Sequence, residues 1–104
     1  MKQSILSRKL LRTGRIENLS VISRAEDGTF CAKAFEVETA NTLFCDGTLV
    51  LTSKSLEIVP FDVLNKMNYD ELLKFFLDFT VDDNPAECKH LFSMTPGNVV
   101  EIQL

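Results

Sequence analysis

Pro60 divides the chain into two parts whose hydropathy patterns differ. In residues 15–59, apolar and polar side chains alternate over short segments, which the turn dipeptides Asp27-Gly28 and Asp46-Gly47 separate. Alternation interrupted by such turns predicts antiparallel strands that pair with their sequence neighbours. Proline has no N–H to donate to a β-ladder, so this run of strands should end at residue 60. The predicted strands cover residues 16–22, 30–38, 43–44, 49–51 and 56–59.

The strongest helix pattern follows Pro60, over residues 69–79. Asn68 can accept a hydrogen bond at the helix N-terminus, and Glu71 three positions later completes a capping box. Apolar side chains then recur at helical spacing, which predicts one principal amphipathic helix. The residues at this spacing are Tyr69, Leu72, Leu73 and Phe76.

Shorter elements are expected on either side of this helix. Asp62 can begin a short helix before it, and Asn84 with Pro85 predicts another that continues through Phe92. At the C-terminus, alternating apolar residues at positions 100, 102 and 104 predict a closing strand.

These segments together predict an α+β fold for a single domain of residues 1–104. The expected sheet is an antiparallel meander of four to six strands, either open or curled into a barrel, with the principal helix and one or two short helices. A chain of 104 residues that is 45% apolar can bury one two-layer core.

Charge is distributed unevenly along the chain. Residues 1–15 carry five basic side chains and no acid, which gives +5, and the other 89 carry six basic and fifteen acidic ones, which gives −9. We therefore expect residues 1–14 to form a basic N-terminal arm or a short helix that contacts an acidic protein surface. The interaction candidates there are Arg8, Arg12 and Arg15.

The same distribution argues against other partners. A body of charge −9 repels phosphate, which disfavours nucleic acid. Ile5, Leu6, Leu10 and Leu11 form only a small apolar patch, which disfavours contact with a membrane surface, and no apolar run is long enough for a transmembrane segment. Three unclustered cysteines indicate reduced thiols and a cytoplasmic location.

Catalytic and metal-binding patterns are sparse. His90 is the single histidine, and Cys88 two positions away would face another side of a helix, so a Cys–His pair is not expected. Asp83, Cys88 and His90 are weak metal candidates, but their spacing matches no metal motif, and we predict no metal, no cofactor and no enzyme activity. A small enzyme that uses His90 is the third functional alternative.

The favoured function is a non-enzymatic module for protein interaction or self-association, with a homodimer as one form. Eight phenylalanines, several of them on one helix, exceed what a small core needs to bury. Phe75, Phe76 and Phe79 are therefore the predicted contact residues.

Two segments resemble known families and carry the second functional alternative, a ligand-binding domain. Residues 47–58, GTLVLTSKSLEI, resemble the strand-turn-strand of GRAM and bacterial PH-like domains, which implies a barrel-like sheet that binds lipid headgroups or protein. Arg8 and Arg12, followed by Asn18 and Ser20, are similar to the RxxxR and [DN]xSxxG motifs of PilZ domains, which implies binding of a cyclic dinucleotide. Ser23 stands where the second motif has glycine.

Overall fold

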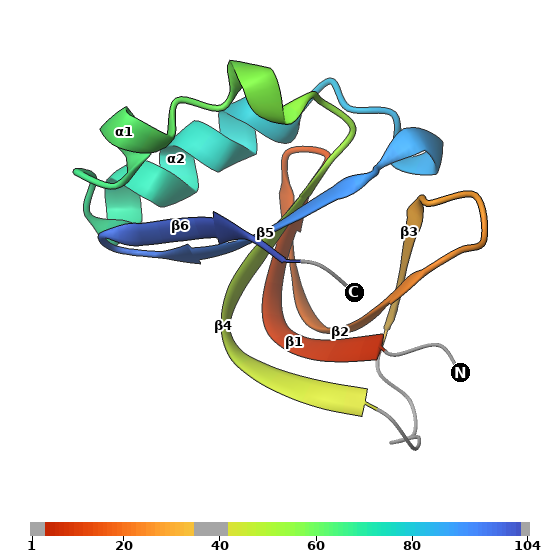
Figure 1. Ribbon diagram of the computed structural model, residues 1–104. Coiled ribbons are helices and arrows are strands. Elements are labelled where there is room, and N and C mark those ends of the chain that lie inside the picture. Colours follow the sequence, from red (N-terminus) through yellow and green to blue (C-terminus); the bar gives the residue numbers. More distant parts are fainter. Residues whose placement is uncertain (1–3, 35–41, 103–104) are drawn as a thin grey trace.

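The computed structural model describes residues 4–34 and 42–102 (Figure 1). These residues form an α+β fold in which a mostly antiparallel sheet packs against one main helix. The strand order is β3-β2-β1-β4-β5-β6, so β3 and β6 are the two edges and the sheet is open, not a barrel. The strands are β1 (Ser4–Arg12), β2 (Arg15–Arg24), β3 (Phe30–Ala34), β4 (Thr42–Thr52), β5 (His90–Thr95) and β6 (Asn98–Glu101).

The prediction of an N-terminal arm or helix is wrong for the described part of that segment, because β1 lies inside the sheet. It pairs antiparallel with β2 and parallel with β4. Ile5, Leu10 and Leu11 are buried, whereas Arg8 and Lys9 are exposed, so the strand keeps its charges in water. Strand pairing thus determines where the basic side chains lie.

The side chains of β1 do not alternate regularly between the two faces of the sheet. Ile5 and Leu10 belong to the same buried cluster although an odd number of positions separates them. Side chains of a regular strand alternate, so this spacing requires a reversal between the two residues. The register between β1 and β4 shifts between Ser7 and Lys9. Figure 1 shows that both strands are bent along their length.

The predicted meander is only partly correct. Asp27-Gly28 lies in the turn between β2 and β3, where Gly28 has φ +90°, as the sequence predicts. Asp46-Gly47 instead lies inside the continuous strand β4, at the register shift with β1. β4 then pairs with β1 in parallel, which a meander does not contain. Residues 35–38 of the predicted second strand lie outside the described residues.

The helical part contains η1 (Leu56–Ile58), α1 (Phe61–Leu64), α2 (Tyr69–Thr80) and η2 (Pro85–Glu87). The capping box of α2 is formed as predicted. The strand predicted over residues 56–59 is wrong, because residues 56–58 form a 3-10 turn before Pro60. The helix expected to reach Phe92 ends at Glu87, and His90 begins β5.

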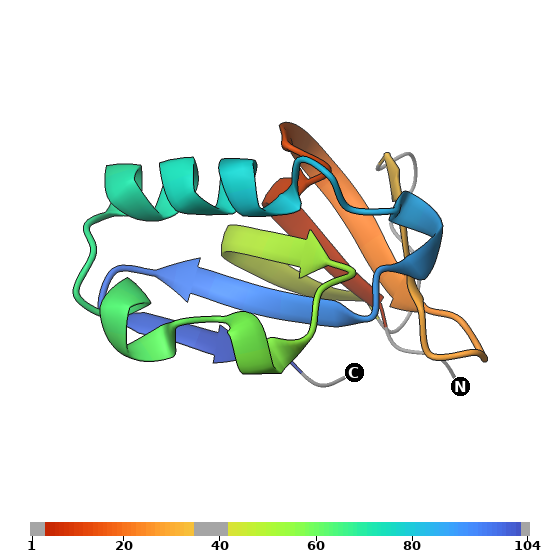
Figure 2. The same ribbon diagram turned by 90° about the horizontal axis from the view of Figure 1, so that it is seen from above.

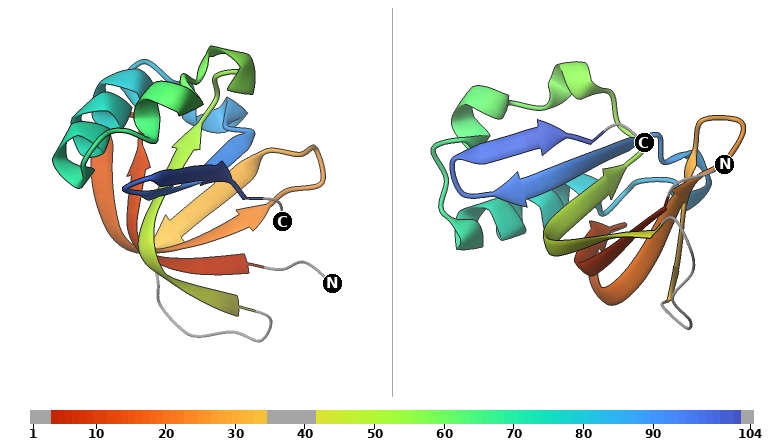
Figure 3. Two further views of the ribbon diagram at one scale, coloured as in Figure 1. Left: turned by 60° about the vertical axis from the view of Figure 1, so that its left-hand side comes forward. Right: turned by 60° about the horizontal axis from the view of Figure 1, so that its bottom comes forward.

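Two buried clusters lie on opposite faces of the sheet. α2 runs along β4 and β5 (Figure 2), and its Leu72 and Phe76 pack with Val50 and Phe92 on one face. On the other face, Leu49 and Leu51 join a second cluster between β5 and the β2–β3 hairpin. Figure 3 shows that the bent sheet leaves the lower end of β4 beyond the cover of α2. No helix in the described residues is long and apolar enough to span a membrane.

Candidate functional site

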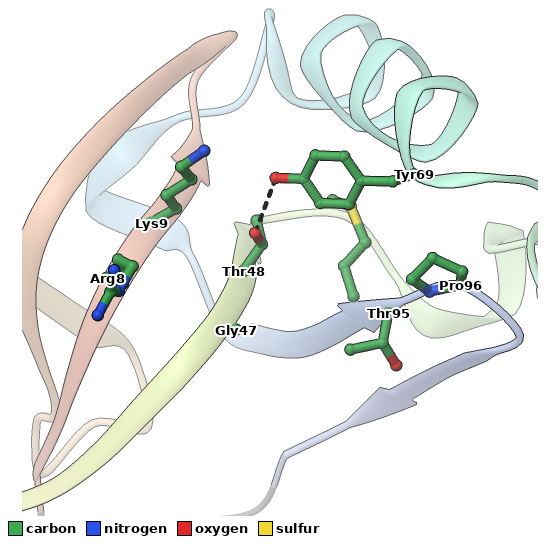
Figure 4. A pocket seen from close by; sticks show the side chains of 8 residues that line it. Arg8, Lys9, Gly47, Thr48, Tyr69, Thr95 and Pro96 are labelled. Atoms are coloured by element: carbon green, nitrogen blue, oxygen red, sulfur yellow. Dashed lines mark hydrogen bonds between the residues drawn. The ribbon is translucent and has the colours of Figure 1, made fainter.

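A pocket of about 280 Å³ opens where the N-terminus of α2 meets the sheet (Figure 4). Lys9, Thr48 and Met94 come from three adjacent strands and pair with one another in register. Tyr69, the first residue of α2, reaches over this row, and its hydroxyl lies 3.0 Å from Thr48 Oγ1. The remaining lining residues are Arg8, Gly47, Thr95 and Pro96.

None of the described residues that line this pocket is acidic. A second pocket of about 340 Å³ near the β1–β2 turn differs, because its charges neutralise one another. There Arg12 Nε donates to Glu17 Oε1 at 2.7 Å and Nη2 donates to Oε2 at 3.3 Å. The pocket beside Tyr69 is therefore the better candidate for an anionic ligand.

Below this pocket, β4 has an open edge. Residues 42–45 pair with β1, but β5 pairs with β4 only at residues 48–52. The outer side of residues 42–47 therefore has no strand partner among residues 4–34 and 42–102. Leu43 and Phe44 are 51% and 59% exposed on this segment, which we call the β4 edge.

Phe44 continues an apolar row across the sheet. It pairs with Leu6 of β1, which pairs with Val21 of β2, so the three side chains share one face. Leu6 and Val21 are half-buried. Cys45 and Leu49 both contact the second cluster, so β4 alternates regularly through the register shift and Phe44 faces the same side as Thr48. The row and the pocket thus lie on one face.

A lysine holds the C-terminal end of α2. Lys54 Nζ donates to the carbonyl oxygen of Phe79, and lies 2.6 Å from both Asp82 Oδ1 and Asp83 Oδ1. Burial alone would lower the pKa of Lys54, but hydrogen bonds to Asp82 and Asp83 outweigh it and raise the pKa. The Asp83 side chain is only 1% exposed and also accepts from Ser53 Oγ at 3.1 Å. This cluster is structural, since each carboxylate already has its partner.

The predicted contact phenylalanines have different environments. Phe76 is completely buried and stacks on Phe92, so it belongs to the core and is not a surface contact in this structure. Phe75 and Phe79 are half-buried and stack on each other with ring centroids 5.4 Å apart. Their exposed parts remain predicted contacts.

The three arginine candidates do not gather into one patch. Arg8 is exposed beside the first pocket, Arg12 pairs with Glu17, and Arg15 lies at the second pocket. Arg12 and Arg15 are register partners and both line the second pocket, whereas Arg8 lies beside the first, so the expectation of one basic arm is wrong.

The three weak metal candidates have different environments and do not form one site. Asp83 is bonded to Lys54, and His90 Nδ1 lies 3.0 Å from Glu101 Oε2. Cys88 is buried, and burial raises the pKa of its thiol to about 11, with the negative charge of Asp83 adding to the shift. No group of three or more histidine, cysteine or acidic residues in the described ranges is placed to hold a metal ion.

Sequence reasoning did not single out Lys9, Thr48, Tyr69 or Phe44 as site residues. The sequence places Lys9 in the expected arm and Tyr69 at one position of the predicted helix. Thr48 and Phe44 flank Asp46-Gly47, which is typical of a hairpin turn. If Asp46-Gly47 is not read as a turn, the adjacent apolar residues Leu43 and Phe44 are the one feature of the sequence that points to this site.

Comparison of this chain with family models, with curated proteins and with solved structures finds no match. The hairpin that a GRAM or PH-like domain implies over residues 47–58 is not formed, because these residues are the end of β4 and η1. Of the PilZ-like residues, Ser20 is buried opposite Ser7. The geometry of the pocket and the β4 edge therefore carries the functional argument.

Proposed function

We propose that this protein is a non-enzymatic interaction module of the cytoplasm that self-associates through the β4 edge. The observation that carries the proposal is a strand segment whose outer side has no partner among the described residues, with Leu43 and Phe44 more than half exposed. Unpaired N–H and C=O groups on such an edge can pair with another strand, and apolar side chains add buried area. Free thiols at Cys31, Cys45 and Cys88 support the cytoplasmic location.

Residues 42–45 of the β4 edge lack several of the usual protections against strand addition. Natural sheets block exposed edges with lysine, proline or very short strands. Residues 42–46 are Thr, Leu, Phe, Cys and Asp, with no lysine or proline, and they belong to a strand of 11 residues. An edge of this composition is suited to pairing.

A second copy of the chain is the occupant that we infer. Antiparallel pairing of residues 42–46 with the same residues of a second copy is symmetric about a two-fold axis, so it closes after two chains. The apolar rows ending in Phe44 of each copy would then meet at the axis and form a continuous apolar surface. Pairing β4 with the β3 or β6 edge of another copy would not close, and would produce chains of molecules.

The expected dimer is weak. Stable interfaces bury about 1,200 Å² or more in total, and a five-residue strand pair with one apolar row is small by this standard. We therefore expect association that depends on protein concentration, with monomer dominant in dilute solution.

Light scattering across a concentration series tests the proposal. The wild-type mass should rise above the monomer value of 11.7 kDa, and Phe44→Lys should remain at that value. Ile58→Lys is the matched control, because Ile58 is an equally exposed apolar residue, at 57%, on η1. Amide exchange at residues 43–45 should slow as concentration increases.

Two results would refute the β4 edge as the interface. One is a wild-type chain that stays monomeric at every concentration. The other is association that survives in Phe44→Lys, which would favour the exposed parts of Phe75 and Phe79 on α2 instead.

A further inference from the structure

We propose that the pocket beside Tyr69 binds the carboxylate of a small ligand whose body is planar and apolar. The site adjoins the proposed dimer contact, because Gly47 belongs both to the pocket lining and to the β4 edge, and both lie on the same face of the sheet. It is defined by Lys9, Thr48 and Tyr69 as polar groups and by Met94 and Pro96 as apolar walls.

The polar groups of the pocket are suited to donating hydrogen bonds. Lys9 is exposed and makes no ion pair with a residue of the described part, so its ammonium group is available to a ligand. Thr48 is 5% exposed and shares a hydrogen bond of 3.0 Å with the Tyr69 hydroxyl. When one hydroxyl donates to the other, the hydrogen of the accepting hydroxyl stays unused. The ammonium and this remaining hydrogen both favour an acceptor, and a charged acceptor most of all.

Figure 4 shows how these groups converge. The Lys9 side chain extends from β1 toward the hydroxyl end of Tyr69, and Thr48 lies on the strand between them. An oxygen placed in this space can accept from Lys9 and from the hydroxyl pair together. Among the described lining residues, no acidic side chain competes for that position.

Size and charge narrow the ligand class. The volume of about 280 Å³ lies just below the range typical of sites for drug-sized ligands, so it suits a small molecule. One ammonium group matches a carboxylate of charge −1 better than a phosphate dianion. Arg8 already has an interaction of its own, so the argument does not use it as a second cation. The Tyr69 ring, Met94 and Pro96 provide the apolar contact that favours a planar body.

Chemical-shift titration of the full chain with benzoate and benzamide tests the proposal. The two molecules have nearly the same shape, but only benzoate carries a charge. Benzoate should shift the amides of Lys9, Thr48, Tyr69 and Thr95, and it should bind at least ten times more tightly than benzamide. Equal binding of the two, shifts at other residues, or no shift with benzoate would overturn the proposal.

Two further ligands identify the source of the carboxylate. N-acetylphenylalanine resembles the C-terminus of a peptide, and tighter binding than benzoate would indicate a chain terminus as the natural ligand. Weaker binding would indicate a small aromatic acid. Inorganic phosphate should bind more weakly than both, and phosphate that binds more tightly than both would overturn the assignment to a carboxylate.

Variants show whether the named groups form the site. Lys9→Met should weaken benzoate binding at least tenfold, and Lys66→Met, at another exposed lysine, should leave it unchanged. Tyr69→Phe should weaken binding less, because Thr48 retains a hydroxyl that can donate. Unchanged binding in Lys9→Met would refute the site. Repeating the titration with Phe44→Lys separates this result from self-association, because ligand binding should persist in a monomer.

Discussion

Replacement of Lys54 by methionine should destabilise the fold strongly, although Lys54 lies on a surface loop. Its ammonium group contacts three oxygens, from Phe79, Asp82 and Asp83, and so ties the segment after β4 to the end of α2. Methionine keeps most of the aliphatic length but removes the charge. The Asp83 carboxylate, whose side chain is 1% exposed, would then lose its cation while remaining buried.

The magnitude follows from the burial of Asp83. Breaking a buried ion pair by removing one partner costs about 3–5 kcal/mol. Here Asp83 keeps hydrogen bonds from Ser53 Oγ and N at 3.1 and 3.3 Å, and the Lys54 side chain is 24% exposed, so we expect a loss of about 2–3 kcal/mol. A domain of this length has about 5–15 kcal/mol of unfolding free energy, so the loss is a large fraction of the total.

Urea unfolding monitored by circular dichroism measures this loss. Lys66→Met is the control, because its side chain is exposed, and such changes stay within about 0.5 kcal/mol. Asp83→Asn added to Lys54→Met should recover part of the stability, because it removes the unpaired buried charge. A Lys54→Met variant as stable as the control, or no recovery on adding Asp83→Asn, would refute this account of the cluster.

The dependence on pH has a definite sign. Hydrogen bonding from Lys54 holds the pKa of Asp82 below its ordinary value of 3.8. A carboxyl with a lowered folded-state pKa contributes stability above its unfolded pKa and loses it as pH falls through the folded value. The pKa of Lys54 is raised, so its contribution is lost only as pH rises through that raised value. The difference in unfolding free energy between wild type and Lys54→Met should therefore decrease in acid below pH 3.8 and in strong alkali.

Two further predictions concern the cap of α2 and the cysteines. Asn68→Ala removes the side chain that accepts from the Glu71 N–H at 2.9 Å, and it should cost about 1 kcal/mol in urea unfolding; a loss below about 0.3 kcal/mol would contradict the cap. Burial holds the pKa of the Cys88 thiol at about 11, so iodoacetamide at neutral pH should modify exposed Cys31 well before Cys88, as peptide mass spectrometry can show. Equal rates for the two in folded protein would contradict the burial of Cys88.

Elements that depend on neighbouring residues could be predicted from the sequence. Asn68 and Glu71 lie three positions apart, so their capping box and the start of α2 were visible in the sequence. The turn at Asp27-Gly28 was visible for the same reason, because Gly28 supplies the positive φ that the turn needs. In both cases the decisive interactions lie within a few positions.

The position of β1 could not be predicted, because it depends on residues far along the chain. The parallel pairing of Leu11 with Val50 joins segments 39 positions apart, and no local pattern encodes such a partner. Inside a sheet covered on both faces, a strand need not alternate apolar and polar residues. The reversal between Ile5 and Leu10 also breaks the two-residue alternation by which a strand is recognised in a sequence. The basic residues of β1 suggested a separate arm for this reason.

The β4 edge and the pocket beside Tyr69 both exist because β5 ends early. Met94, the partner of Thr48, is followed by Thr95, which ends β5, and then by the turn at Pro96-Gly97. Thr95 Oγ1 donates to the Asn98 carbonyl at 2.8 Å across this turn, and Gly97 has φ +80°. A longer β5 would pair with residues 42–47 and cover the edge beside Phe44. The same extension would move Pro96 away from Tyr69 and remove a wall of the pocket. The early turn of β5 therefore opens the proposed interface and the proposed ligand site together, which explains why they are neighbours on one face.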